Sequence, residues 1–318
     1  MIKMLAPALR HPTNRDPDEF RRYWEQSHGP LFSNTRRLRR YVQHITMGEL
    51  AGDDEIRCTY DGCSMFWYDG LDDLRHLASE PFDVLVWEAT MRDDRQLFDR
   101  STQWPPHNRF VMIIAEERVV VDEPAKPGMV KVIRTLSRAP GLTPAAFDAR
   151  WSNEHAALVG ALPVLRRYVQ NPALVEAHTI RGMTHDGWSE LWFDDLESFR
   201  LARRSPQWAQ LTEASRDLFA EPIGLCVARE RIQKEFDTPP RRWATGLSPS
   251  DIANRLAAQG YTDRVTDYLA VDLADRLAQA DSENRVAVWT DEHLVLLTEP
   301  PVDLRPITGS EDHRDTPK

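Results

Sequence analysis

The feature that most constrains the fold of this chain is an internal repeat. FRRYWEQSHGPL at 20–31 matches FDARWSNEHAAL at 147–158, and LRRYVQ at 38–43 recurs unchanged at 165–170. Both matches have the same offset of 127 residues. A shared offset over two separate segments, one of them six identities long, indicates a duplication and not a coincidence.

Two further matches follow in the same order. DGCSMFWYDGLDDL at 61–74 aligns with DGWSELWFDDLESF at 186–199, and AEERV at 115–119 aligns with ARERI at 228–232. The offset falls to 125 and then to 113, which places the deletions in loops. The chain is therefore two copies of one domain followed by a tail, and we predict boundaries of 1–122, 129–236 and 237–318.

Each copy has the pattern of four strands and two helices. Asp16-Pro17 and Thr143-Pro144 predict the start of the first helix, which we expect to run to about the histidine of the repeat. Acidic residues predict the start of the second helix. The expected strands in the two copies are MIKMLAPAL and VKVIRTLS, both LRRYVQ segments, SMFWY and SELWF, and VMIIAEERVVV and GLCVARERI.

The order β-α-β-β-α-β is the ferredoxin-like motif, an α+β fold whose antiparallel sheet carries helices on one face only. The other face of each sheet is therefore uncovered within a single copy. Two tandem copies can bury these faces against each other and close a barrel within one chain.

These residues resemble the EthD family of the dimeric α+β barrel superfamily. The carriers are a strand, then F-x3-W-x3-H with a following Leu, then LRRYVQ, then an aromatic strand, present in both copies. In other members of the family, two chains pair as a homodimer to form the barrel. The resemblance implies that the two copies in this chain form the same barrel together. The superfamily includes cofactor-free decarboxylases, dehydratases, cyclases, isomerases and monooxygenases of aromatic or polyketide compounds, and also haem enzymes.

The predicted catalytic residues are two pairs from the repeat. His28 and His155 stand at the family's histidine position, and a histidine can act as acid or base near neutral pH. The alternative is a histidine that only binds a carbonyl at the helix C-terminus. Tyr41 and Tyr168 are predicted to hold a substrate oxygen.

Gln43 and Gln170 share a strand face with these tyrosines, and the valine between them has the opposite face. We expect the Tyr and Gln side chains to point into the barrel and the valines to lie under the helices. The alternative is a buried tyrosine with a satisfied hydroxyl. The other predicted substrate-binding residues are His44, Asn171, Trp24, Trp151, Trp67 and Trp192, with core packing as the alternative for the tryptophans.

Secondary candidates lie between the second and third strands. His178 and His185 belong to the variable loop of copy 2, and Cys63 would need a lowered pKa to act as a nucleophile. Asp61 and Asp186 precede a glycine, where a turn role is favoured.

No sequence motif supports a metal or a nucleotide cofactor. HExxH, DxDxDG, GxGxxG, P-loop and GxSxG patterns are all absent, and the histidines are scattered. A haem would need an axial histidine, for which His155 is the candidate, but no cofactor is the expectation.

Composition excludes several function classes. A net charge of −10 argues against binding to nucleic-acid phosphates. The three cysteines fit a reduced, cytoplasmic protein, and no apolar run suits a membrane. In the tail, 248–260 and 261–280 have helical patterns, and 285–290 and 293–300 indicate a β-pair. This appendage, with a disordered end, could cap the barrel or mediate homodimerisation.

The preferred interpretation is a cofactor-independent lyase, a decarboxylase or dehydratase, acting on a small aromatic or polyketide-like hydrophobic compound. The alternatives are a ligand-binding accessory protein of a degradation pathway and a cofactor-free or haem-dependent oxygenase of the same superfamily.

Overall fold

The structure is a computed structural model that describes residues 1–13, 16–33, 35, 37–75, 90, 93–99, 112–179, 185–236, 286–289 and 294–297. By their contacts the residues divide into two compact units. Unit 1 comprises 1–22, 39–71 and 97–234, and unit 2 comprises 23–38, 72–96 and 235–318. Each unit is described by itself.

The elements follow the predicted order in both copies. Copy 1 contains β1 (Ile2–Ala8), α1 (Pro17–Tyr23), η1 (Trp24–His28), α2 (Gly29–Phe32), β2 (Arg40–Thr46), η2 (Gly48–Leu50), β3 (Gly62–Tyr68), α3 (Leu71–Arg75), β4 (Ile113–Ala115) and β5 (Arg118–Asp122). Copy 2 contains β6 (Val130–Leu136), α5 (Pro144–Arg150), η3 (Trp151–His155), α6 (Ala156–Gly160), β7 (Leu165–Pro172), η4 (Val175–Thr179), β8 (Gly187–Phe193), α7 (Leu196–Arg203), α8 (Pro206–Arg216) and β9 (Gly224–Lys234).

The predicted helix starts are confirmed. Asp16 Oδ1 accepts a hydrogen bond from the backbone N–H of Asp18 at 2.8 Å, and Thr143 Oγ1 accepts one from Ala146 at 3.2 Å. Both caps satisfy a donor that a helix N-terminus leaves unpaired.

The predicted helix ends are wrong. His28 and His155 each close a five-residue π-helical turn, and the chain continues helically beyond them through α2 and α6. In copy 2 the next residues, AALVG, include strong helix formers, so nothing ends the helix at the histidine. Such single π-turns within a helix are frequent at functional sites.

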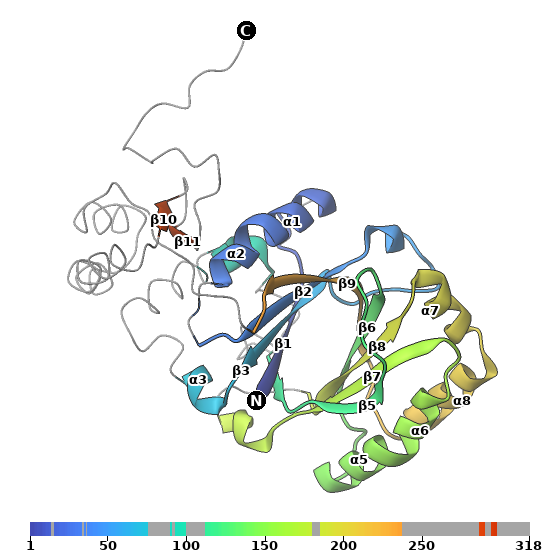
Figure 1. Cartoon of the computed structure of the whole chain (residues 1–318). Coiled ribbons are helices and arrows are strands. Elements are labelled where there is room, and N and C mark those ends of the chain that lie inside the picture. Colours follow the sequence, from blue (N-terminus) through green and yellow to red (C-terminus); the bar gives the residue numbers. More distant parts are fainter. Residues whose placement is uncertain are drawn as a thin grey trace. The chain divides into compact units, whose positions relative to one another are not determined.

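Nine strand segments form one sheet in the order β4-β1-β3-β2-β9-β6-β8-β7-β5. Its two end segments, β4 and β5, are successive parts of the same chain stretch, separated only by Glu116 and Glu117. Because one continuous stretch forms both ends, the sheet closes on itself as a barrel (Figure 1). The predicted intrachain α+β barrel is confirmed.

The two copies exchange the ends of their last strands. β4 pairs with β1 of copy 1, and its continuation β5 pairs with β7 of copy 2. Likewise, the first part of β9 pairs with β6, and its second part pairs with β2 of copy 1. The halves are therefore joined by a reciprocal pair of strand additions.

Each strand has one side chain face toward the barrel interior and one toward its outside. In copy 2 the outer face packs under α5–α8 (Figure 1), where Val132, Leu191 and Val227 share a core with Val159 and Phe199. The interior holds a second core that both copies build. It contains Leu5, Val42, Cys63, Met65, Trp67, Ile133, Trp188, Cys226 and Ala228.

The connection between β2 and β3 in copy 1 packs against copy 2. Met47, Leu50 and Ile56 are buried in the same core as the helices of copy 2. Arg200 on α7 donates to Asp53 at 2.7 Å across the same contact. The two copies therefore share a core as well as a sheet.

In the tail, the predicted β-pair is confirmed, because β10 (Val286–Trp289) pairs antiparallel with β11 (Leu294–Leu297). The helices predicted at 248–260 and 261–280, and the end predicted to be disordered, lie outside the described residues. Among the described residues, no helix has the length and apolarity needed to span a membrane.

Candidate functional site

The structure separates the predicted site residues onto two faces of the sheet. Val42 lies in the interior core, and Val169 packs with Trp192, which lies over Lys131 inside the barrel. The alternating tyrosines and glutamines are therefore on the outer face, so their predicted inward orientation is wrong. Both faces of a barrel strand are buried, and alternation alone does not tell which face turns inward.

In copy 2 the outer-face residues form a packed hydrogen-bonded group. Gln170 Nε2 donates to the Tyr168 hydroxyl at 2.9 Å and to the Trp151 carbonyl at 2.7 Å. Tyr168 is fully buried, and burial raises the pKa of its phenol to about 12. In copy 1 the equivalent Gln43 donates to the Tyr41 hydroxyl at 3.0 Å.

His155 stands in a largely apolar environment. Its Nε2 lies 3.2 Å from Ser215 Oγ, and its ring packs edge-on against Phe219 at 4.9 Å. Among the described residues Nδ1 has no hydrogen-bond partner. Burial, helped by the charge of Arg134, lowers the pKa of His155 to about 3. The imidazole is therefore neutral at physiological pH and a poor proton acceptor.

His28, in unit 2, has a contrasting environment. Its Nδ1 lies 2.6 Å from Asp93 Oδ2, and its Nε2 lies 3.5 Å from Asp94 Oδ1. The Tyr23 hydroxyl donates to the other oxygen of Asp93 at 2.5 Å. All three His and Asp side chains are buried. The ring therefore has a carboxylate oxygen beside each of its two nitrogens.

The repeat extends to these carboxylates. The bridges Arg10–Phe98 and Arg138–Phe219 are equivalent, which aligns residues near 98 with residues near 219 at an offset of 121. At that offset Asp94 corresponds to Ser215, and Asp93 corresponds to an alanine. Sequence reasoning missed both aspartates because LF at 97–98 and 218–219 is too short a match to find alone.

A second polar group, also missed, fills the barrel interior. Lys3 pairs with Glu117 at 2.9 Å, and Lys131 pairs with Glu230 at 3.0 Å. Glu190 forms ion pairs with both lysines. The two lysines occupy equivalent places in MIKML and MVKVI, and this recurrence inside apolar strands was the available signal.

Four predicted substrate-binding residues border this cluster. His44 Nε2 lies 3.1 Å from the Lys131 ammonium, and Asn171 Nδ2 donates to Glu190 at 2.9 Å. The Lys3 and Lys131 ammonium groups lie over the rings of Trp67 and Trp192, at 5.0 and 4.3 Å. Trp24 and Trp151 are instead fully buried in the π-turns.

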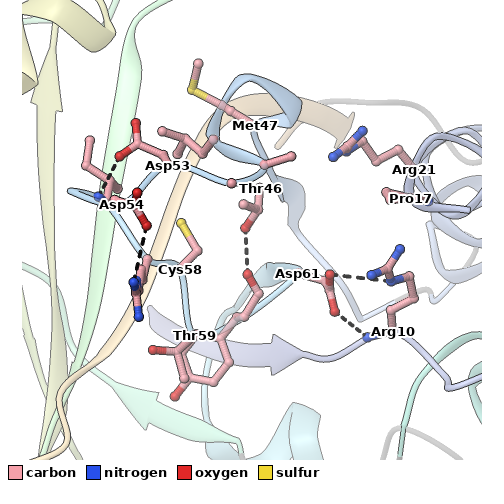
Figure 2. Close-up of a pocket in the computed structure, with 16 residues that line it drawn as sticks. Arg10, Pro17, Arg21, Thr46, Met47, Asp53, Asp54, Cys58, Thr59 and Asp61 are labelled. Carbon is pink, nitrogen blue, oxygen red and sulfur yellow. Dashed lines mark hydrogen bonds and ion pairs between the residues drawn. The ribbon is translucent and has the colours of Figure 1, made fainter. Parts of the chain in front are cut away.

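A surface cavity of about 580 Å³ lies at the β2–β3 connection of copy 1 (Figure 2). Its walls include Arg10, Arg21, Thr46, Cys58 and Asp61. Asp61 accepts a hydrogen bond from the backbone N–H of Arg10 at 2.8 Å, and copy 2 repeats this contact between equivalent residues. That pair therefore anchors a turn, and none of the predicted catalytic or substrate-binding residues lines this cavity.

The secondary candidates gain no catalytic features. Burial raises the pKa of Cys63 well above its usual value and that of Cys58 to about 12, so neither thiol is activated. His185 has a pKa lowered by burial, and His178 lies in η4. Within the described ranges, no three His, Cys, Asp or Glu side chains are grouped to hold a metal ion.

The EthD domain model matches residues 13–101 and 139–223, which together exceed half of the chain. The chain belongs to the EthD family. Both matches fall on the two copies of the repeat, so the family resemblance is confirmed for each copy. A comparison with curated proteins finds no match.

Several solved structures are similar to this EthD chain. An ethyl tert-butyl ether D family protein of Bacillus halodurans C-125 is 22% identical over 32% of this chain and 99% of its own, with a TM-score of 0.29. An anthrone oxidase-like protein is 13% identical over 74% and 94%, with a TM-score of 0.49. A chlorite dismutase variant of Candidatus Nitrospira defluvii is 11% identical over 85% and 94%, with a TM-score of 0.42.

The surroundings of His155 do not fit an axial haem ligand. Its Nε2 faces Ser215, its ring lies against Phe219, and the side chain is 3% exposed. An axial ligand needs an open side on which the iron and the macrocycle can lie. Packing fills that side here.

Proposed function

We propose that this EthD protein is a cofactor-independent lyase in which His28 of copy 1 transfers the proton. The observation that carries the proposal is the buried His28–Asp93 contact of 2.6 Å, with Tyr23 on the second carboxylate oxygen. A carboxylate on Nδ1 fixes the ring, and Nε2, which faces Asp94 at 3.5 Å, is the nitrogen that would exchange a proton with the substrate.

The difference between the copies supports this choice. Copy 1 surrounds its histidine with two aspartates, and copy 2 replaces them with alanine and serine. A histidine with a pKa near 3 releases its proton too readily to hold one at neutral pH. Copy 1 is therefore the acid–base half, and copy 2 is the supporting half.

In a decarboxylation, protonated His28 would deliver its Nε2 proton to the carbon that loses CO2. In a dehydration, neutral His28 would remove a proton from carbon while hydroxide leaves from the neighbouring carbon. Asp93 stabilises the imidazolium in either direction. Tyr41 and Gln43 belong to unit 1, and their binding of a substrate oxygen stays a separate prediction.

The substrate class proposed is a small aromatic or polyketide-like compound, because superfamily members act on such compounds. The test uses hydroxylated aromatic carboxylic acids as probes and measures CO2 release and water loss without dioxygen. We expect turnover by the wild type, and we expect His28→Asn and Asp93→Asn to lower kcat by about 10²–10⁴. His155→Asn is the matched control and should retain activity.

Two results would redirect the proposal. Dioxygen consumption without an added cofactor would favour the monooxygenase alternative. Tight binding of the probes with no turnover, unaffected by His28→Asn, would favour a non-catalytic accessory role. Far-UV circular dichroism of each variant separates loss of activity from loss of fold.

A further inference from the structure

The lysines of the interior cluster and their glutamate and tryptophan partners have pseudo-twofold symmetry. Lys3 pairs with Glu117 as Lys131 pairs with Glu230, and both carboxylates come from equivalent places in the repeat. Each lysine also lies over the tryptophan paired with it on the neighbouring strand. The symmetry is broken at a single acidic position, where copy 2 has Glu190 and copy 1 has Met65.

Glu190 contacts the lysines of both copies. Its Oε1 forms an ion pair with Lys3 and its Oε2 one with Lys131. Oε1 also accepts hydrogen bonds from Asn171 at 2.9 Å and from the Trp188 indole at 3.0 Å. The side chain is fully buried, so this single carboxylate is shared across the pseudo-twofold axis.

Met65 is the residue of copy 1 at the position equivalent to Glu190. Its Sδ lies 3.6 Å from the Lys131 ammonium, so Met65 and Glu190 both contact the same lysine from opposite copies. A glutamate in place of Met65 would therefore bring a second carboxylate to a position that already has one. Two carboxylates that contact the same buried lysine repel each other strongly.

We propose that Glu190 makes the inner face of copy 2 selective for copy 1 as its partner. The pairing seen here sets two lysines against three buried or half-buried carboxylates. A barrel formed by two copy 2 domains would set two lysines against four carboxylates, with both Glu190 side chains at the centre. A buried ionic group of this kind specifies a partner by penalising the alternative.

The full chain allows a direct test by exchanging the two residues. In the wild-type background, Glu190→Met should lower the melting temperature by several degrees, because Lys3, Asn171 and Trp188 lose their shared acceptor. Met65→Glu alone should lower the melting temperature more than Glu190→Met alone, because it adds a second central carboxylate. In the Met65→Glu background, Glu190→Met should instead raise the melting temperature, because it restores a single central carboxylate.

This reversal of sign is the result that supports the proposal. If Glu190→Met lowers the melting temperature equally in both backgrounds, the carboxylate is not shared and the proposal is wrong. The isosteric Glu190→Gln variant keeps an acceptor for Asn171 and Trp188 and removes only the charge, so it should also raise the melting temperature in the Met65→Glu background.

Pairing itself is measured on the whole protein after one cut. Residues 124–128 between β5 and β6 are exposed, so a protease site placed there nicks the folded chain without removing a strand. After denaturation and refolding, native mass spectrometry should find only the one-to-one complex of the two fragments. Glu190→Met should add pairs of identical copy 2 fragments.

A statistical mixture of pairs from the wild type would overturn the proposal. If the fragments do not refold after the cut, the exchange of Met65 and Glu190 in the intact chain decides between the outcomes.

Discussion

Two histidines at equivalent positions of a repeat have opposite surroundings in this protein. His155 faces a serine and a phenylalanine, while His28 lies between two aspartates. The difference lies in the partner elements and not in the histidine-bearing turns, which have the same π-helical form. The two environments thus differ at two positions of a neighbouring segment, where copy 1 has Asp93 and Asp94 and copy 2 has alanine and serine.

His44 gives a prediction on pH dependence. Burial and the Lys131 ammonium lower the pKa of His44 to about 4, below the 6.5 of an unfolded histidine. Between these values the unfolded chain binds a proton that the folded chain does not. Stability therefore falls as pH falls from about 6.5 to about 4, by about 1.4 kcal/mol per pH unit.

His44→Asn tests this, because asparagine is the residue at the equivalent position of copy 2. Urea unfolding gives the free energy of unfolding at pH 7 and at pH 4.5. Its decrease between these pH values should be about 2–3 kcal/mol smaller in the variant than in the wild type. Parallel pH profiles for the two proteins would contradict the assignment of the lowered pKa to His44.

At the scale of elements, local sequence signals are strong at helix starts. Thr143 Oγ1 caps α5 through Ala146, and Thr143→Ala should cost about 1 kcal/mol in urea unfolding. Thr212→Ala is the matched control. Thr212 is exposed in the middle of α8, where alanine is the better helix former, so that variant should lose no stability.

The sequence predicts the strands and the repeat well, and it fails where environment decides. The predicted helix ends are wrong because nothing in AALVG stops a helix at His155. The predicted inward orientation of Tyr168 and Gln170 is wrong, and burial could not have decided it, because Val169 on the other strand face is equally buried. Lys3 and Lys131 were overlooked because a lysine on a strand is ordinarily on the surface, and only the closed barrel brings carboxylates to them.

At the scale of the molecule, the barrel should unfold as one unit. Ile56 belongs to copy 1 but is buried in the core under the helices of copy 2. Ile56→Ala should lower stability by about 2–5 kcal/mol. Ile232→Ala, on a strand residue that is 52% exposed, is the control and should change little.

Fluorotryptophan NMR can follow the two copies separately through Trp67 and Trp192. Both native resonances should disappear at the same urea concentration, and Ile56→Ala should move both together. Loss of the Trp192 resonance alone in the variant would show that the copies unfold independently.

The exchange of strand ends also has a consequence during synthesis. β2 has only β3 beside it until β9, at Gly224–Lys234, has been made. About 110 residues separate the end of β5 from the end of β9, which at about 5–20 residues per second takes several seconds of translation. For that time the nascent first half presents an open strand edge, the kind of surface on which two ribosome-bound chains can pair with each other.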